Sequence, residues 1–237
     1  MNIKLNPAKV LKFFIIVNII FFFLHIITQY LFYVQAIKIP GLRFFNLDDE
    51  KSLPSLFTVF EWSVIVVLFY VITIISKDKK SYYWWGFVIL FSFLTLDEFA
   101  SIHEPMAQYF RKTFNTSGVL YFAWVIPYAF GLIALLLIYG KFLISLNRKI
   151  LFLFIVSGIV FISGAVIMEL FEGSYVESNG FNNVYYLVFV PIEETLEMIG
   201  LSLFIYSLLQ YLKMEAGNFN FIFSEPNKKD QQHPPPS

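Results

Sequence analysis

Six long apolar runs constrain this chain more than any other feature. Each holds about 20 residues or more, which is enough for a helix rising about 1.5 Å per residue to cross about 30 Å of hydrocarbon. Apolar residues make up 58% of the 237-residue chain, 30 of them Phe, and the mean hydropathy is +0.68. The sequence therefore predicts an all-α, multi-pass membrane protein with six transmembrane helices, at residues 13–32, 56–75, 84–104, 119–138, 150–171 and 184–212.

The runs define one transmembrane domain, residues 1–214. From residue 215 the chain turns polar and ends in a Pro-rich stretch, so residues 215–237 are predicted to be a disordered tail. Pro127 and Pro191 fall inside the fourth and sixth runs and predict a kink or a restart of each helix.

Lys and Arg are distributed unevenly between the two sides of these six helices. With the N-terminus in the cytoplasm, 12 of the 17 basic residues lie on the cytoplasmic side. This bias predicts that both termini are cytoplasmic. The corresponding location is a bacterial cytoplasmic (inner) membrane.

Acidic residues inside or at the ends of the runs are the strongest functional signal. No run interior holds a Lys or Arg that could pair with them. An ionised carboxylate near the bilayer centre costs about 2.5–3.5 kcal/mol, so we expect these groups to be protonated, hydrated or bound to a cation. The nine residues are Glu61, Asp97, Glu98, Glu104, Glu169, Glu172, Glu193, Glu194 and Glu197.

The predicted topology brings these carboxylates together. The third and fifth helices run outward and the sixth runs inward, so their acidic residues converge in the outer half of the bilayer. In a continuous third helix Asp97 and Glu104 share a face, and Glu98 is expected to be peripheral.

Carboxylates with one imidazole favour a hard or borderline divalent cation such as Zn, Fe, Mn, Mg or Ca. We expect Glu172 or Glu194 to act as a general base. Proton handling and a purely structural set of carboxyl groups stay open as alternatives, and His25 is predicted to be a hydrogen-bonded helix-packing residue. The predicted metal ligands are Asp97, His103, Glu104, Glu169, Glu193 and Glu197.

Composition excludes several classes of function. The chain has no Cys, which excludes disulfides, thiolate metal sites and cysteine nucleophiles. Its net charge is zero, so no nucleic-acid partner is indicated. It contains neither a phosphate-binding P-loop nor a glycine-rich dinucleotide turn.

Three segments resemble an uncharacterised family of polytopic bacterial membrane proteins. The first is residues 45–55 of the first outer loop. The second is residues 96–104, which begin with Leu-Asp-Glu and end with His-Glu. The third is Glu-Glu-x-x-Glu-Met at residues 193–198. The resemblance implies the membrane architecture and the bacterial membrane. It brings no established activity.

Three functions remain open from sequence. The first is a metal-dependent enzyme embedded in the bilayer that acts on a lipid or lipid-linked substrate. The second is a proton- or cation-coupled transporter or channel that uses the same carboxylates. The third is a non-catalytic membrane assembly factor.

Overall fold

The protein folds as a bundle of long helices. A computed structural model describes residues 2–4, 6–33, 35, 40–76, 81–181, 186–215 and 220–222. The prediction of a helical fold is confirmed, with two three-residue strands added. In chain order the elements are β1 (Asn2–Lys4), α1 (Pro7–Tyr33), η1 (Pro40–Phe45), α2 (Leu53–Ile75), α3 (Ser81–Ala100), α4 (His103–Phe114), η2 (Gly118–Leu120), α5 (Val125–Ile144), α6 (Arg148–Ile162), the π-helical turn η3 (Ser163–Met168), α7 (Glu169–Asn179), α8 (Tyr186–Glu215) and β2 (Asn220–Ile222).

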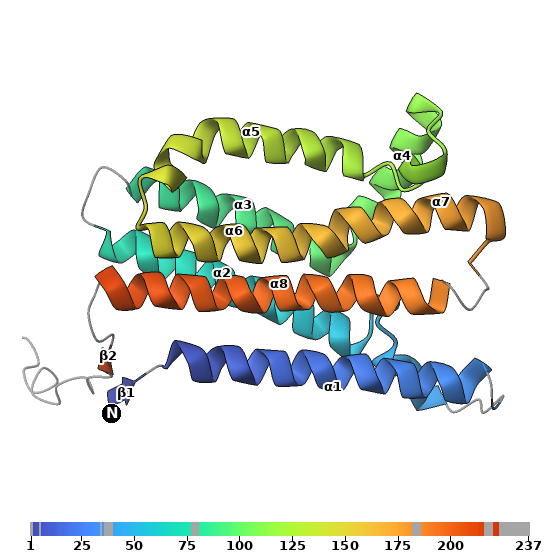
Figure 1. Cartoon of the computed structure of the whole chain (residues 1–237), viewed down its shortest axis with the longest axis horizontal. Helices are drawn as coiled ribbons and strands as arrows, with labels where there is room; N and C mark the ends of the chain where they lie inside the picture. The colour runs from blue at the N-terminus through green and yellow to red at the C-terminus, as the bar shows by residue number, and fades with distance from the viewer. Residues whose placement is uncertain are drawn as a thin grey trace, which may run out of the picture.

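Helix α8 is the central element of the bundle. It packs against α1, α2, α6, η3 and α7, whereas α5 makes few contacts with α6 and is mostly exposed. Figure 1 shows α8 lying between α1 and the continuous α6–η3–α7 rod. Because α8 touches elements from both ends of the sequence, it sets their relative positions.

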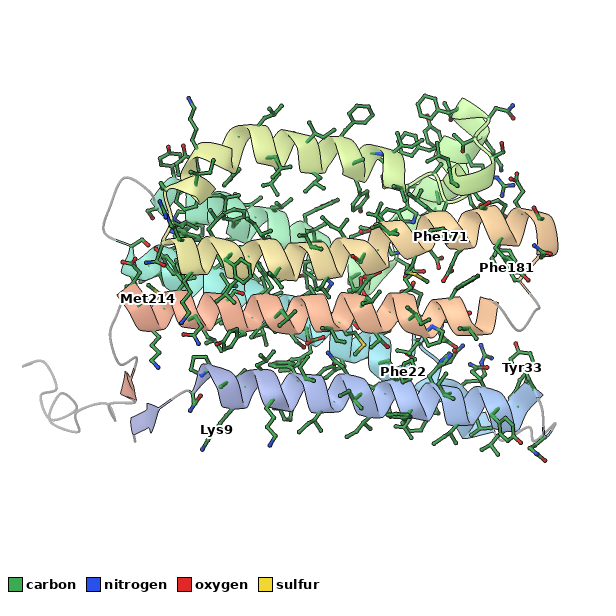
Figure 2. The ribbon with its side chains drawn as sticks, viewed as in Figure 1. Lys9, Phe22, Tyr33, Phe171, Phe181 and Met214 are labelled. Atoms are coloured by element: carbon green, nitrogen blue, oxygen red, sulfur yellow. The ribbon has the colours of Figure 1, made fainter. Side chains whose placement is uncertain are left out.

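The main apolar core is built around the C-terminal half of α8. Ile205 and Leu208 are completely buried there, against Phe69 of α2, Trp84 of α3 and Ile150 of α6. Figure 2 places Met214 and Lys9 at this end of the bundle, and Phe171, Phe181 and Tyr33 at the other end. The main core therefore packs one end of the bundle, and a smaller apolar cluster of Leu47, Val190 and Met198 lies toward the other end, beside the acidic residues of α8.

Several helices are long and apolar enough to cross a membrane. Within the described residues these are Pro7–Tyr33, Leu53–Ile75, Val125–Ile144 and Arg148–Asn179, and α3 with α4 makes a fifth if the bent pair counts as one span. α8 is not among them; its sequence holds three glutamates near one end and Lys213 and Glu215 near the other. Six spans and the orientation of the termini stay predictions.

The prediction of a continuous helix over residues 84–104 is wrong. α3 ends at Ala100, and α4 starts at His103 with an axis turned by 88°. Ser101 adopts a positive φ of 48°, which ends the regular helix. His103 and Glu104 therefore lie on a separate helix, and the argument that Asp97 and Glu104 share one helical face does not hold.

The structure places Pro127 at the start of a helix and shows no restart at Pro191, where a kink stays a prediction. α5 begins at Val125, six residues later than the predicted run, so Pro127 lies in its first turn, where no intrahelical donor is lost. Pro191 lies inside α8, which continues through it from Tyr186 to Glu215. The irregular turn is instead η3, which joins α6 to α7.

The two ends of the described chain meet. β1 and β2 pair antiparallel, with Asn2 opposite Ile222, at the end of the bundle where α1 begins (Figure 1). Most of the predicted tail, residues 215–237, lies outside the described residues, although Glu215 still belongs to α8.

Candidate functional site

Three carboxylates meet where α7 and α8 approach each other. One oxygen each from Glu169, Glu172 and Glu193 lies within 4.8 Å of the others. Glu169 and Glu172 are three residues apart and share one face of α7. We call these three residues the carboxylate triad; they could hold a metal ion.

The π-helical turn η3 positions the triad. A π turn holds one more residue than a regular turn, so it shifts the direction in which the following side chains point. Within η3, Gly164 lies so close to α8 that an added Cβ would stand 2.6 Å from the carbonyl oxygen of Glu193 and 2.9 Å from Cγ of Glu197. Only a glycine allows this approach, which brings the first turn of α7 beside the glutamates of α8.

The surroundings of the triad satisfy some of its oxygens and not others. Trp124 donates its indole N–H to Oε1 of Glu169 at 2.7 Å. Glu172 is 3% exposed, and its Oε1 has no hydrogen-bond partner. Three carboxylates at this spacing cannot all be ionised without a compensating positive charge, because their mutual repulsion and desolvation are too costly. The triad therefore demands a cation or shared protons.

Asp97 and His103 form a second group beside the triad. Asp97 accepts hydrogen bonds from the Tyr128 hydroxyl and from the backbone N–H of His103. Nδ1 of His103 lies 3.4 Å from Oδ1 of Asp97, and the His103 ring lies 5.5 Å from the ring of Trp124. Because Trp124 binds Glu169, this group is linked to the triad through one indole.

Glu194 and Glu197 extend the acidic region along α8. Both are half-buried, and both lie within electrostatic range of Glu98 on α3. Glu194 also lies within range of Glu50, which follows η1. Glu98 itself is half-buried and does not line the cavity described below, so the expectation that it is peripheral stays a prediction.

A cavity of about 940 Å³ adjoins the triad. Its walls come from the segment at residues 48–50, α4, residues 115–124, α7 and the first turns of α8. Glu169, Glu172, Glu193 and Glu194 line one side, with His103 and Trp124 next to them. The volume is in the range of pockets that enclose small molecules.

Two predicted members of the acidic cluster lie elsewhere. Glu104 is exposed and contributes to the rim of the cavity, since it belongs to α4 and not to a straight third helix. Glu61 lies in the third turn of α2, is completely buried and does not line the cavity.

Glu61 belongs to a separate polar network between α1, α2 and α8. Ser202 donates to Oε1 of Glu61 at 2.6 Å, and Asn18 donates its Nδ2–H to the Ser202 hydroxyl at 3.0 Å. At most 1% of any of these side chains is exposed. The network joins three helices across the bundle, although Oδ1 of Asn18 and Oε2 of Glu61 are buried in it without a hydrogen-bond partner.

His25 is hydrogen-bonded as expected, but it binds the segment after η1 and not another long helix. Its Nδ1 accepts from the backbone N–H of Leu47 at 3.0 Å. The imidazole therefore fastens the segment after η1 to α1, and the neighbouring pair Gln29–Asn46 does the same at 2.8 Å. This segment carries Glu50 to the cavity.

Sequence reasoning missed the aromatic and basic residues of the site. Trp124 and Tyr128 hydrogen-bond the acidic groups, and Arg111 and Tyr121 lie on the cavity wall. The available signal was a cluster of aromatic, basic and polar residues between two apolar runs, which is also the ordinary composition of a membrane interface.

The arrangement could hold a divalent cation at the wall of the cavity. Oxygen ligands alone suit Mg, Mn or Ca, and the nearby imidazole of His103 extends the choice to Zn or Fe. Of the residues predicted as metal ligands, Glu169 and Glu193 meet in the triad with Glu172, which was predicted as a base. Asp97 and His103 pair with each other at its side, and Glu197 lies one turn from Glu193.

Comparison with curated proteins and with solved structures finds no match. A family model described as "Domain of unknown function (DUF8692)" matches residues 10–211. This match runs from the second turn of α1 almost to the end of α8, so it includes the triad, the cavity and the buried network. The chain belongs to the DUF8692 family.

Proposed function

We propose that this protein is a multi-pass enzyme of the bacterial cytoplasmic membrane that uses a divalent cation, bound by Glu169, Glu172 and Glu193, to act on a lipid or lipid-linked substrate. The observation that carries the proposal is the triad at the wall of a cavity: each of its three carboxylates places an oxygen within 4.8 Å of the others, and Oε1 of Glu172 is buried without a hydrogen-bond partner. A bound cation would polarise a carbonyl or phosphoryl oxygen, or activate a water molecule.

Helix lengths support a position near the bilayer surface. Glu169 follows Arg148 by 21 residues along the continuous rod, and Glu193 precedes Lys213 by 20 residues on α8. Both separations correspond to about 30 Å, the thickness of the hydrocarbon, at about 1.5 Å per residue. If Arg148 and Lys213 lie at the cytoplasmic surface, the triad lies at the outer headgroup boundary.

The cavity offers a proton acceptor besides the triad. Glu194 lines the cavity next to Glu193 but is not a member of the triad. A carboxylate beside a bound cation and open to the cavity is placed to take a proton from water or from a substrate hydroxyl. We therefore assign the general-base role to Glu194, and the ligand role to Glu172.

Elemental analysis of detergent-purified protein tests the proposal directly. We expect close to one equivalent of a divalent metal in the wild type, and its loss in the double variant Glu172→Gln/Glu193→Gln, which removes two anionic ligands while keeping side-chain size. Glu104→Gln is the matched control, because Glu104 is exposed at the cavity rim. It should retain the metal.

The second part of the test is a titration of chelator-treated protein with Mn²⁺, measured by isothermal calorimetry. A folded wild type that neither contains metal nor binds Mn²⁺ would overturn the proposal. Equal Mn²⁺ affinity in the wild type and in Glu172→Gln/Glu193→Gln would place the cation elsewhere.

A second candidate function, a proton- or cation-coupled transporter, is favoured by the network at Glu61. Ser202 lies five residues beyond Glu197 on α8, so this network carries polar groups about 8 Å further along the bundle than the acidic cluster. Cation or proton flux in liposomes that stops in Glu197→Gln and in Glu61→Gln would support transport. Metal-dependent turnover without flux would support the enzyme.

A further inference from the structure

The cavity beside the triad has a basic wall as well as an acidic one. Arg111 and Lys112, in the last turn of α4, line it together with the glutamates of α7 and α8. Within the described part of the chain neither side chain forms an ion pair, although Glu104, Glu177 and the triad line the same cavity. Because neither basic side chain is paired with a carboxylate of the described residues, both are available to bind an anion from outside the chain.

Arg111 is held in place by an aromatic ring. Its Cζ lies 3.5 Å from the centre of the Tyr121 ring. Stacking leaves the edges of a guanidinium group free to donate hydrogen bonds, and a planar pair of N–H groups matches two oxygens of a phosphate. The side chain is thus oriented before any ligand arrives.

The basic wall is tied to the helix that carries the triad. Tyr121 packs on Gly173 of α7 so closely that an added Cβ would lie 3.1 Å from Cβ of Tyr121. On the same face, the backbone N–H of Gly118 donates to Oε2 of Glu177. Gly173 follows Glu172 directly, so a short path of contacts fixes Arg111 relative to the triad.

Helix α4 has the character of a helix at a membrane surface. Its axis is turned by 88° from that of α3, which is itself apolar. Tyr109 and Phe114 expose large aromatic surfaces, while Arg111 and Lys112 occupy the polar part of the same helix. Exposed aromatic residues interspersed with basic ones suit a helix that lies in the headgroup layer. The mouth of the cavity then opens among the headgroups.

We propose that the cavity binds the phosphate group of an anionic lipid headgroup, held between Arg111 and Lys112 on one side and the cation of the triad on the other. The inference rests on the proposed function and names the substrate class of the same site. A cation held by carboxylates facing an Arg–Lys pair is an arrangement that stabilises the charge of a phosphate ester from two directions. The cavity volume of about 940 Å³ accommodates a headgroup.

Binding of short-chain lipids to the full-length protein in detergent tests this proposal. The probes are dihexanoyl phosphatidic acid, dihexanoylglycerol, which lacks the phosphate, and inorganic phosphate, each measured with Mn²⁺ present. We expect phosphatidic acid to bind at least about tenfold more tightly than either of the others. Arg111→Gln should weaken it by about tenfold or more and leave Mn²⁺ affinity unchanged.

Phosphatidic acid binding is also measured for three further variants. Arg111→Lys retains the charge without the planar group and should fall between the wild type and Arg111→Gln. Lys112→Gln removes the second cation without disturbing the contact with Tyr121, so it tests the proposal if Arg111→Gln does not fold. Arg148→Gln removes an exposed cation at the start of α6 and should bind the lipid as the wild type does.

The proposal is overturned if dihexanoylglycerol binds as tightly as phosphatidic acid, or if neither basic variant weakens binding. Equal binding of inorganic phosphate would show that the cavity recognises phosphate without a lipid, and would overturn the lipid assignment. Mn²⁺ binding without phosphatidic acid binding removes this inference alone. Absence of Mn²⁺ binding in the wild type removes the proposed function and this inference together.

Discussion

At the scale of single residues, the protein separates its buried carboxyl groups into two environments. The triad has an unpartnered oxygen on Glu172 and adjoins a cavity. Glu61 is enclosed by helices and lines no cavity; its Oε1 accepts a hydrogen bond from Ser202, which also accepts one from Asn18, and its Oε2 is buried without a partner. The first environment is open to a ligand, whereas the second has the form of a link between helices.

Substitution of Glu61 tests its role as a link. Glu61→Ala removes the acceptor of Ser202 and leaves a void in a completely buried position, so we expect a loss of about 2–4 kcal/mol of unfolding free energy. Glu61→Gln keeps the size and the acceptor, and should cost less than about 1 kcal/mol. Urea- or SDS-induced unfolding in detergent measures both. Equal losses in the two variants would contradict the interpretation.

At the scale of helices, irregular turns decide where the functional side chains point. α3 ends at Ala100, so His103 starts a new helix, where its backbone N–H donates to Asp97. η3 interrupts α6–α7 immediately before Glu169. Such interruptions weaken the regular hydrogen-bonding pattern of a helix, and π turns recur at functional sites for the geometry that they provide.

Gly164 is the test of this close packing. An added methyl group in Gly164→Ala would stand 2.6 Å from the Glu193 carbonyl oxygen, which forces η3 and α8 apart. We expect a loss of about 1–3 kcal/mol of unfolding free energy and weaker Mn²⁺ binding. Thermal unfolding and calorimetry measure the two effects.

Gly158→Ala is the matched control for that experiment. Gly158 lies in α6, and an added Cβ would meet nothing within 4 Å. Alanine is favoured over glycine in a helix interior by about 1 kcal/mol, so this variant should be at least as stable as the wild type. Equal behaviour of the two alanine variants would show that the approach of η3 to α8 is not tight.

At the scale of the whole molecule, the bundle is polarised along its length. The apolar core lies around Ile205 and Leu208 of α8, and the cavity lies around Glu193 and Glu194 of the same helix. Basic residues Arg148 and Lys213 lie at the core end. Such an arrangement suits a protein that is anchored by one half and performs its chemistry in the other.

Because the sequence contains no Cys, single introduced cysteines can show on which side of the membrane each end of the bundle lies. We expect Ser174→Cys in α7 and Lys213→Cys at the end of α8 to react with a membrane-impermeant maleimide from opposite sides of inverted and right-side-out vesicles, because about 30 Å of hydrocarbon separates the two ends. Both positions are exposed. Labelling of both from one side would contradict a membrane-spanning bundle.

Some features of this protein follow from the sequence alone, because they depend on composition and on local periodicity. Long apolar runs without Lys or Arg specify long helices in any tertiary context, since their backbone groups are satisfied within the helix. The concentration of carboxylates in residues 97–104, 169–172 and 193–197 likewise marked the segments that reach one end of the bundle.

Only the tertiary structure decided which of those carboxylates meet. The spacing along a regular helix paired Asp97 with Glu104, but a turn at Ser101 with positive φ redirected Glu104 to the rim. The same spacing could not reveal that Gly164 lets η3 touch α8, or that Glu61 turns toward Ser202. Such pairings depend on close contacts between elements far apart in sequence, which a single helical period does not encode.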